Sequence, residues 1–233
     1  MTITAQAIVE TMLESIQTSN YSEMPYKHWY LSHCLPEDVV DAMLGLPFEA
    51  PSLDGISGKR ELHNATRTYF DTPNMARFAV CKAFNEAFQG GALTDRIEQN
   101  FCINLEGSYL RVEIAQDADG FWLEPHSDLG VKLFTMLLYT SRDPSHADLG
   151  TDMYDAQKNH VGRVPFRSNG ALVFIPSDIT YHGFERRPIQ GVRKSVIINY
   201  VTKDWRAREQ LAFPGQPIKH LQPALAHSTH ALS

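Results

Sequence analysis

The feature that most constrains the fold is a succession of short strand-like segments in the second half of the chain. Between residues 107 and 203, eight such segments are separated by clusters of Gly, Pro, Asn, Asp and Ser. They read SYLRVEIA, FWLEPHSD, LFTMLLYT, TDMYDA, RVPF, GALVFIPS, ITYHGFERR and RKSVIINYVTK. Several are apolar throughout, which is typical of strands covered on both faces. This pattern predicts a mainly β core of the jelly-roll or cupin-like type, a double-stranded β-helix.

The preceding residues show the three-to-four-residue apolar spacing of amphipathic helices instead. Four segments carry it: ITAQAIVETMLESIQ, LPEDVVDAMLGL, TPNMARFAVCKAFNEAFQGG and LTDRIEQNF. We therefore expect an α+β protein in which N-terminal helices pack on one sheet. One domain is expected, with residues 1–104 as a mainly helical support region, 105–203 as the jelly-roll core and 204–233 as a C-terminal extension.

Composition excludes several classes of partner. The 233 residues carry a net charge of −6, which argues against nucleic-acid binding, because that function needs a concentrated basic surface. The longest apolar runs are only strand-sized, and the N-terminus lacks the basic and apolar regions of a signal peptide. Three widely spaced cysteines read as buried free thiols. We expect a cytoplasmic protein without a membrane partner, and the sequence predicts no oligomeric state.

Three residues have the types and spacing of an open metal site. His126 and Asp128 are two apart, so on a strand their side chains would share one face. This H-x-D pair is a weak signal alone, because it recurs by chance at strand ends. His182 follows a strongly apolar strand and supplies a third ligand. Two imidazoles and one carboxylate leave a face open, which suits Fe(II) that binds a co-substrate and dioxygen, whereas a closed zinc site would need a fourth ligand.

A carboxylate-binding pair follows on the last strand. Arg193 and Ser195 are two apart and share one face, so a guanidinium and a hydroxyl form a fork for a carboxylate. If the last strand neighbours the one that ends near His182, the fork points into the cavity of the metal. Such a cavity predicts a co-substrate that chelates the metal at one end and binds the arginine at the other.

Together these motifs resemble the 2-oxoglutarate/Fe(II)-dependent dioxygenases. The series HSD, YHG and RKS is similar to their H-x-D … H … R-x-S pattern, and EPHSDLGVKLFTMLLYTS resembles the prolyl-hydroxylase-like branch. The resemblance covers residues 105–203. The segment LGTDMYD lacks that branch's double glycine, and RVEIAQDADGFW lacks its usual tyrosine. Both departures argue against a peptidyl-prolyl substrate.

The resemblance implies specific roles for six residues. The catalytic iron ligands would be His126, Asp128 and His182, and the distal carboxylate of 2-oxoglutarate would bind Arg193, helped by Ser195 and Tyr139. The implied cofactors are Fe(II), 2-oxoglutarate and O2. The implied reaction is hydroxylation of an unactivated C–H bond in a small-molecule or amino-acid-like substrate, with decarboxylation of 2-oxoglutarate to succinate and CO2.

The alternation of side chains along the strands also predicts residues that could contact the substrate. Arg111 and Glu113 share one face of their strand, where they are either substrate contacts or a paired rim. Trp122 and Glu124 alternate with His126 and are expected to line the substrate mouth.

The segment HNATR and the residue Lys132 carry weaker signals. In HNATR, Asn64 and Arg67 are candidates for a lid, whereas Lys132 reads as a solvated turn residue.

Three alternative functions remain open at this point. The first is a peptidyl hydroxylase of the prolyl type. The second is a cupin-like metal protein that does not use 2-oxoglutarate, which the Arg193-x-Ser195 fork argues against. The third is a non-catalytic binding protein on the same fold, which the intact set of three ligands argues against.

Overall fold

The computed structural model describes residues 3–51, 58, 67–128 and 130–219. Asn64 and the last fourteen residues, 220–233, therefore lie outside the described residues. Within the described part of the chain, no helix combines the length and apolar character needed to cross a membrane.

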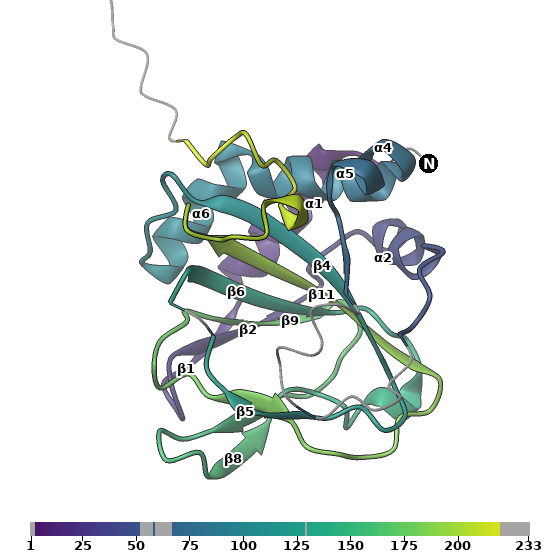
Figure 1. The fold of residues 1–233 in the computed structure, drawn as a ribbon, viewed down its shortest axis with the longest axis vertical. Helices are drawn as coiled ribbons and strands as arrows, with labels where there is room; N and C mark the ends of the chain where they lie inside the picture. The colour runs from purple at the N-terminus through teal and green to yellow at the C-terminus, as the bar shows by residue number, and fades with distance from the viewer. Residues whose placement is uncertain (1–2, 52–57, 59–66, 129, 220–233) are drawn as a thin grey trace, which may run out of the picture.

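Two antiparallel sheets form the centre of the molecule (Figure 1). The large sheet has the order β1-β2-β9-β6-β11-β4-β3, and the small sheet has the order β5-β10-β7-β8. The strands of the large sheet are β1 Asn20–Ser22, β2 His28–Ser32, β3 Thr68–Tyr69, β4 Tyr109–Ala118, β6 Lys132–Tyr139, β9 Gly170–Phe174 and β11 Val192–Val201. Those of the small sheet are β5 Leu123–His126, β7 Asp152–Tyr154, β8 His160–Arg163 and β10 His182–Phe184. The two facing sheets confirm the predicted double-stranded β-helix.

Helices cover the outer face of the large sheet, as expected from the N-terminal sequence (Figure 1). They are α1 Ala5–Gln17, α2 Glu37–Leu44, α4 Thr72–Arg77, α5 Ala79–Gln89 and α6 Gly91–Phe101, with short 3-10 turns at Pro144–His146 and Arg208–Gln210. Thr4 caps α1, because its hydroxyl accepts a hydrogen bond from the backbone N–H of Ala7. Asp71 caps α4 in the same way at Asn74.

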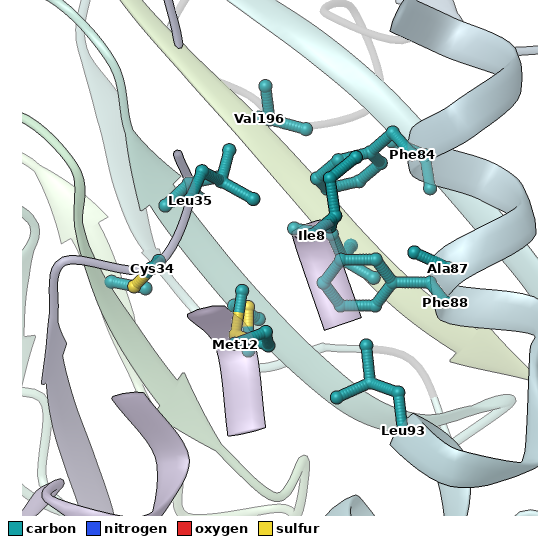
Figure 2. Close-up of a cluster of buried hydrophobic side chains, with 14 of the residues drawn as sticks. Ile8, Met12, Cys34, Leu35, Phe84, Ala87, Phe88, Leu93 and Val196 are labelled. Atoms are coloured by element: carbon teal, nitrogen blue, oxygen red, sulfur yellow. The ribbon is translucent and has the colours of Figure 1, made fainter. Parts of the chain in front are cut away.

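The main hydrophobic core lies between these helices and the sheet. Figure 2 shows Ile8 and Met12 of α1 with Phe84 and Phe88 of α5, near Val196 of β11, and all five are fully buried. Because side chains alternate along a strand, the residues of β11 on either side of Val196 point to the opposite face. The helical layer therefore takes one face of the large sheet and leaves the other for the space between the sheets.

Three local features differ from the sequence expectations. The segment predicted as one helix is interrupted at Phe78, whose backbone is extended (φ −127°, ψ 114°), so it forms α4 and α5. The strand expected at RVPF lies earlier, at His160–Arg163. Cys34 and Cys81 are buried free thiols as expected, whereas Cys102 is exposed after the end of α6.

The N-terminal region is also less purely helical than its sequence indicates. It contributes three strands to the large sheet: β1 and β2 extend it beyond β9, and β3 pairs with β4 at the other edge. These strands have two to five residues each, too few for periodicity to reveal. β3 matters for the site, because Arg67, the residue directly before it, lines the cavity between the sheets.

Candidate active site

Three neighbouring strands of the large sheet form the floor of a cavity. Their inward residues are Thr135, Leu137 and Tyr139 on β6, Arg193, Ser195, Ile197 and Asn199 on β11, and Arg111, Glu113, Ala115 and Asp117 on β4. The antiparallel register aligns them in rows: Thr135 with Asn199 and Arg111 at one end, and Arg193 with Asp117 at the other. The floor is therefore polar at both ends, and the apolar side chains of Leu137, Ile197 and Ala115 lie between them.

Strand pairing in the small sheet brings the two histidines of the predicted metal site together. His182 of β10 lies directly opposite His126 of β5, and their ring centroids are 4.4 Å apart. Asp128 follows two residues after the end of β5. One ligand atom from each of the three residues lies within 4.8 Å of the other two. This spacing fits three ligands around one ion, with the cavity on the open side.

Backbone carbonyls fix the orientation of both imidazoles. The Nδ1 atom of His126 is 2.9 Å from the carbonyl oxygen of Glu124, and Nδ1 of His182 is 3.1 Å from that of Thr180. A ring nitrogen that donates to a carbonyl carries the proton, so the other nitrogen, Nε2, offers its lone pair to a metal. The rings are thus held in the tautomer that metal binding requires.

A chain of hydrogen bonds holds the carboxylate. Arg111 Nη1 donates to Asn199 Oδ1 (3.1 Å), and Asn199 Nδ2 donates to Thr135 Oγ1 (2.9 Å). The hydroxyl of Thr135 then donates to Asp128 Oδ2 (2.7 Å). Each residue in this series donates to the next one, so Asp128 Oδ2 is the final acceptor and its carboxyl group is held in place for metal binding.

Lys132 differs from the sequence expectation of a solvated turn residue. It is the first residue of β6 and is buried, and its ammonium donates to Asp128 Oδ1 at 2.8 Å. Both side chains of this ion pair are under 7% exposed. The ammonium supplies positive charge beside the carboxylate, at the end of the cavity where the three possible ligands meet.

Arg193 lies at the other polar end and is already paired. Its Nη1 donates to Asp117 Oδ2 at 2.5 Å, and its Nε donates to the carbonyl oxygen of Leu149 at 2.7 Å. The guanidinium also lies 4.9 Å from the ring centroid of Phe184. These contacts hold the guanidinium at the cavity wall. Its Nη2 atom carries further N–H donors beside those of Nε and Nη1.

Ser195 and Tyr139, the predicted helpers of Arg193, line the same cavity and are cross-strand neighbours. The hydroxyl of Tyr139 is 2.8 Å from that of Thr151, and its ring centroid is 5.8 Å from the Arg193 guanidinium. Burial raises the pKa of Tyr139, although Thr151 and Arg193 oppose the shift. A phenol that stays protonated can still donate a hydrogen bond to a carboxylate at this end of the cavity.

The structure places Arg111 and Glu113 in a buried ion pair, with 2.5 Å between Nη2 and Oε2. Arg111 also donates to Tyr69 and Gln210, and Trp205 covers it at 4.8 Å. The C-terminal segment therefore seals this end of the floor. Arg111 was expected either to contact the substrate or to form a paired rim with Glu113, and its contacts in the structure are those of the ion pair.

Trp122 and Glu124, expected at the substrate mouth, are not among the described residues that line the cavity. Their neighbours Phe121 and Leu123 line it instead. The reason is a bulge between β5 and β10. Leu123 pairs with Phe184 and His126 pairs with His182. The three-residue interval on β5 therefore lies opposite a two-residue interval on β10, so that Leu123 points to the same side as His126.

A second cluster, Asp152, His160 and Glu185, has ligand atoms close enough to hold an ion. However, Asp152 already accepts from Arg163 Nε at 2.7 Å and from Arg187 Nη1 at 2.6 Å. Burial would raise the pKa of Asp152, but the hydrogen bonds from Arg187, the Glu185 backbone and Arg163 hold it below its ordinary value. This carboxylate is the centre of an ion-pair network that ties β7 to β8 and to the segment after β10.

Several cavity residues were not among the predicted site residues, and the polar ones include Asp117, Lys132 and Thr135. Asp117 and Thr135 had a usable signal, since each continues the inward alternation of its strand. Arg67 was expected only as part of a lid and Lys132 only as a solvated turn residue, because their places at the cavity depend on long-range pairing of β3 and on the ion pair with Asp128.

The fold is shared with solved prolyl hydroxylases. A Pseudomonas putida prolyl-4-hydroxylase matches with a TM-score of 0.56 at 16% identity, over 84% of this chain and 99% of the other. A Phytophthora capsici prolyl 4-hydroxylase structure matches with a TM-score of 0.57 at 12% identity, over 88% and 68%.

A third match is a Trichoplax adhaerens prolyl hydroxylase, solved with a hypoxia inducible factor peptide. It has a TM-score of 0.50 at 12% identity, over 85% of this chain and 91% of the other. No family model and no curated protein matches the sequence. At these identities the likeness identifies the fold, the double-stranded β-helix of the prolyl hydroxylases.

Proposed function

We propose that this chain is an Fe(II)- and 2-oxoglutarate-dependent dioxygenase that hydroxylates an unactivated C–H bond of a small-molecule or amino-acid-like substrate. The observation that carries the proposal is one cavity with two matched ends. At one end, ligand atoms of His126, Asp128 and His182 lie within 4.8 Å of one another. At the other end, Arg193 presents a guanidinium. Only a co-substrate with both a chelating and a carboxylate end uses the two together.

The donor set fits ferrous iron. Two neutral imidazoles and a carboxylate on one side of an ion leave positions open for co-substrate and dioxygen. The carbonyl oxygens of Glu124 and Thr180 keep the two Nε2 lone pairs available, and Thr135 keeps the carboxylate of Asp128 in place. When bound, iron would supply the oxidising chemistry, in which O2 is consumed, 2-oxoglutarate yields succinate and CO2, and the second oxygen atom goes to the substrate.

The remaining tasks fall to the chain's own side chains. Arg193, with Ser195 and Tyr139 beside it, binds the distal carboxylate of 2-oxoglutarate. Leu137 and Ile197 are apolar side chains in the middle of the floor and exclude water from the space beside them. The sheet positions these groups on rigid strands, so that the reacting C–H bond is presented to a fixed site.

A peptidyl substrate is the second candidate, and the likeness to a prolyl hydroxylase solved with a peptide is the observation that favours it. The departures in LGTDMYD and RVEIAQDADGFW favour a small molecule. An assay of succinate release distinguishes the two candidates. Stimulation by proline-rich peptides indicates a peptidyl substrate, and stimulation by free amino acids indicates a small molecule.

The decisive experiment is anaerobic addition of Fe(II) and 2-oxoglutarate to the full chain. We expect a weak visible charge-transfer band from the chelate, and its absence in the wild type refutes the proposal. His182→Ala removes a proposed ligand and should abolish the band. His160→Ala, in the second cluster, is the matched control and should leave the band unchanged.

The co-substrate end is tested separately. Arg193→Ala should weaken 2-oxoglutarate binding by about 10- to 100-fold, the effect of losing a charge-assisted hydrogen bond, and leave Fe(II) binding unchanged. Equal loss of both affinities would contradict the assignment of Arg193.

A further inference from the structure

Among the residues that the structure describes, the charged side chains that line the cavity do not balance. Four are cationic and three are carboxylates, and three ion pairs use all but one of them. The pairs are Arg111–Glu113, Lys132–Asp128 and Arg193–Asp117, and the remaining cation is Arg67. Among the described carboxylates, none lies within ion-pair distance of Arg67.

Arg67 occupies a fixed place at the cavity. It directly precedes β3, whose Tyr69 is paired with Glu113 of β4. Its side chain lines the cavity, and its Nη1 atom is buried without a hydrogen-bond partner among the residues that the structure describes. Burial by itself would raise the pKa of Glu113, but the charges of Arg111, Arg67 and Lys132 hold it below its ordinary value. The charge of Arg67 is therefore felt inside the site.

A bound metal and co-substrate would not remove this excess. The proposed Fe(II) carries two positive charges and 2-oxoglutarate carries two negative charges, so together they leave the balance of the cavity unchanged. The two histidine ligands are neutral. A guanidinium with a buried, unpaired nitrogen is costly, and one anion at this position would remove the cost.

We propose that Arg67 binds a single carboxylate on the molecule that the site hydroxylates, so that the substrate is a small carboxylic acid. This inference rests on the proposed function and narrows its substrate class. A neutral peptide segment would leave the guanidinium unpaired. A phosphate monoester carries close to two negative charges, whereas the cavity has an excess of only one positive charge.

The test uses the full chain loaded with Mn(II) and 2-oxoglutarate, because Mn(II) accelerates the relaxation of nuclei held near it. The probes are acetate, acetamide, methylammonium and methyl phosphate, whose methyl protons are followed by NMR. We expect the strongest relaxation for acetate. In Arg67→Gln, acetate should bind about tenfold more weakly, the effect of one charge-assisted hydrogen bond. Arg67→Lys should retain most of the effect.

Matched controls make the test specific. Arg77→Gln removes an exposed arginine of α4 and should leave acetate relaxation unchanged. Equal relaxation of acetate and acetamide by the wild type would overturn the inference without any variant, as would unchanged acetate relaxation in a folded Arg67→Gln protein. A stronger effect on methyl phosphate would overturn the carboxylate assignment. If Mn(II) does not bind at all, the proposed function and this inference both fail.

Discussion

Asp117→Asn is expected to tighten the binding of 2-oxoglutarate. In the free protein, Asp117 Oδ2 accepts from Arg193 Nη1 at 2.5 Å, and both side chains are at most 7% exposed. The distal carboxylate of the co-substrate would approach the same guanidinium. Asp117 is therefore an internal competitor for the positive charge to which the proposed co-substrate would bind. Asparagine keeps an oxygen acceptor for the arginine but removes the negative charge.

The magnitude follows from Coulomb's law. Two carboxylates on one guanidinium are about 5 Å apart, and at an effective dielectric constant of about 20 their repulsion is about 3 kcal/mol. Removing it would tighten binding by up to about 100-fold, since about 1.4 kcal/mol corresponds to a factor of ten. Relaxation and solvent lower this value, so we expect a Kd for 2-oxoglutarate that falls at least about tenfold.

The assay is anaerobic titration of the Fe(II)-loaded protein with 2-oxoglutarate, followed by the charge-transfer band. The thermal unfolding temperature of the free variant should also fall, because Arg193 loses its charged partner, and saturating 2-oxoglutarate should restore it. Asp38→Asn, a carboxylate of α2 outside the cavity, is the matched control. An unchanged or larger Kd for Asp117→Asn, with Fe(II) binding intact, refutes the competition argument.

Two further predictions concern a hydrogen bond and an ion-pair network. Thr135→Val removes the donor to Asp128, so Fe(II) affinity should fall by about tenfold or more in a competition assay, and unchanged affinity would show that the hydroxyl does not support the ligand. Asp152→Asn should lower the free energy of unfolding at neutral pH, because Arg163 and Arg187 lose their shared carboxylate. The pKa of Asp152 is depressed in the folded state, so its contribution is present above its unfolded pKa of about 3.9 and is lost as pH falls through the lower folded value. In urea unfolding, the gap between wild type and variant should therefore narrow below about pH 4, and a constant gap would argue against the shift.

The fold was largely accessible from the sequence because its signals are local. Alternation and turn residues predicted the strands that form β4 to β11, and only β8 is displaced from the predicted segment. The same local signals missed the break at Phe78 and the strands β1, β2 and β3. Those short strands exist because an edge of the large sheet offers unpaired backbone groups, which no local pattern encodes.

The candidate site divides in the same way. The spacing of residues in the sequence predicted His126, Asp128, His182 and Arg193 as site residues, and all four line one cavity in the structure. Alternation also identified Arg111 and Glu113 as inward residues. It misplaced Trp122 and Glu124 relative to the cavity, because the bulge opposite Phe184 shifts the phase of β5 after Leu123.

The sequence by itself determined which chemical groups the chain carries and at what spacing, and side-chain alternation turns that spacing into a shared face. Only the tertiary structure decided how those groups are paired. Asp117 pairs with Arg193 and Asp128 with Lys132, and within the described part of the chain Arg67 is the cavity cation that has no carboxylate partner. Charge pairing depends on distances of a few ångströms across strands far apart in the chain, and those distances exist only once the two sheets have closed on each other.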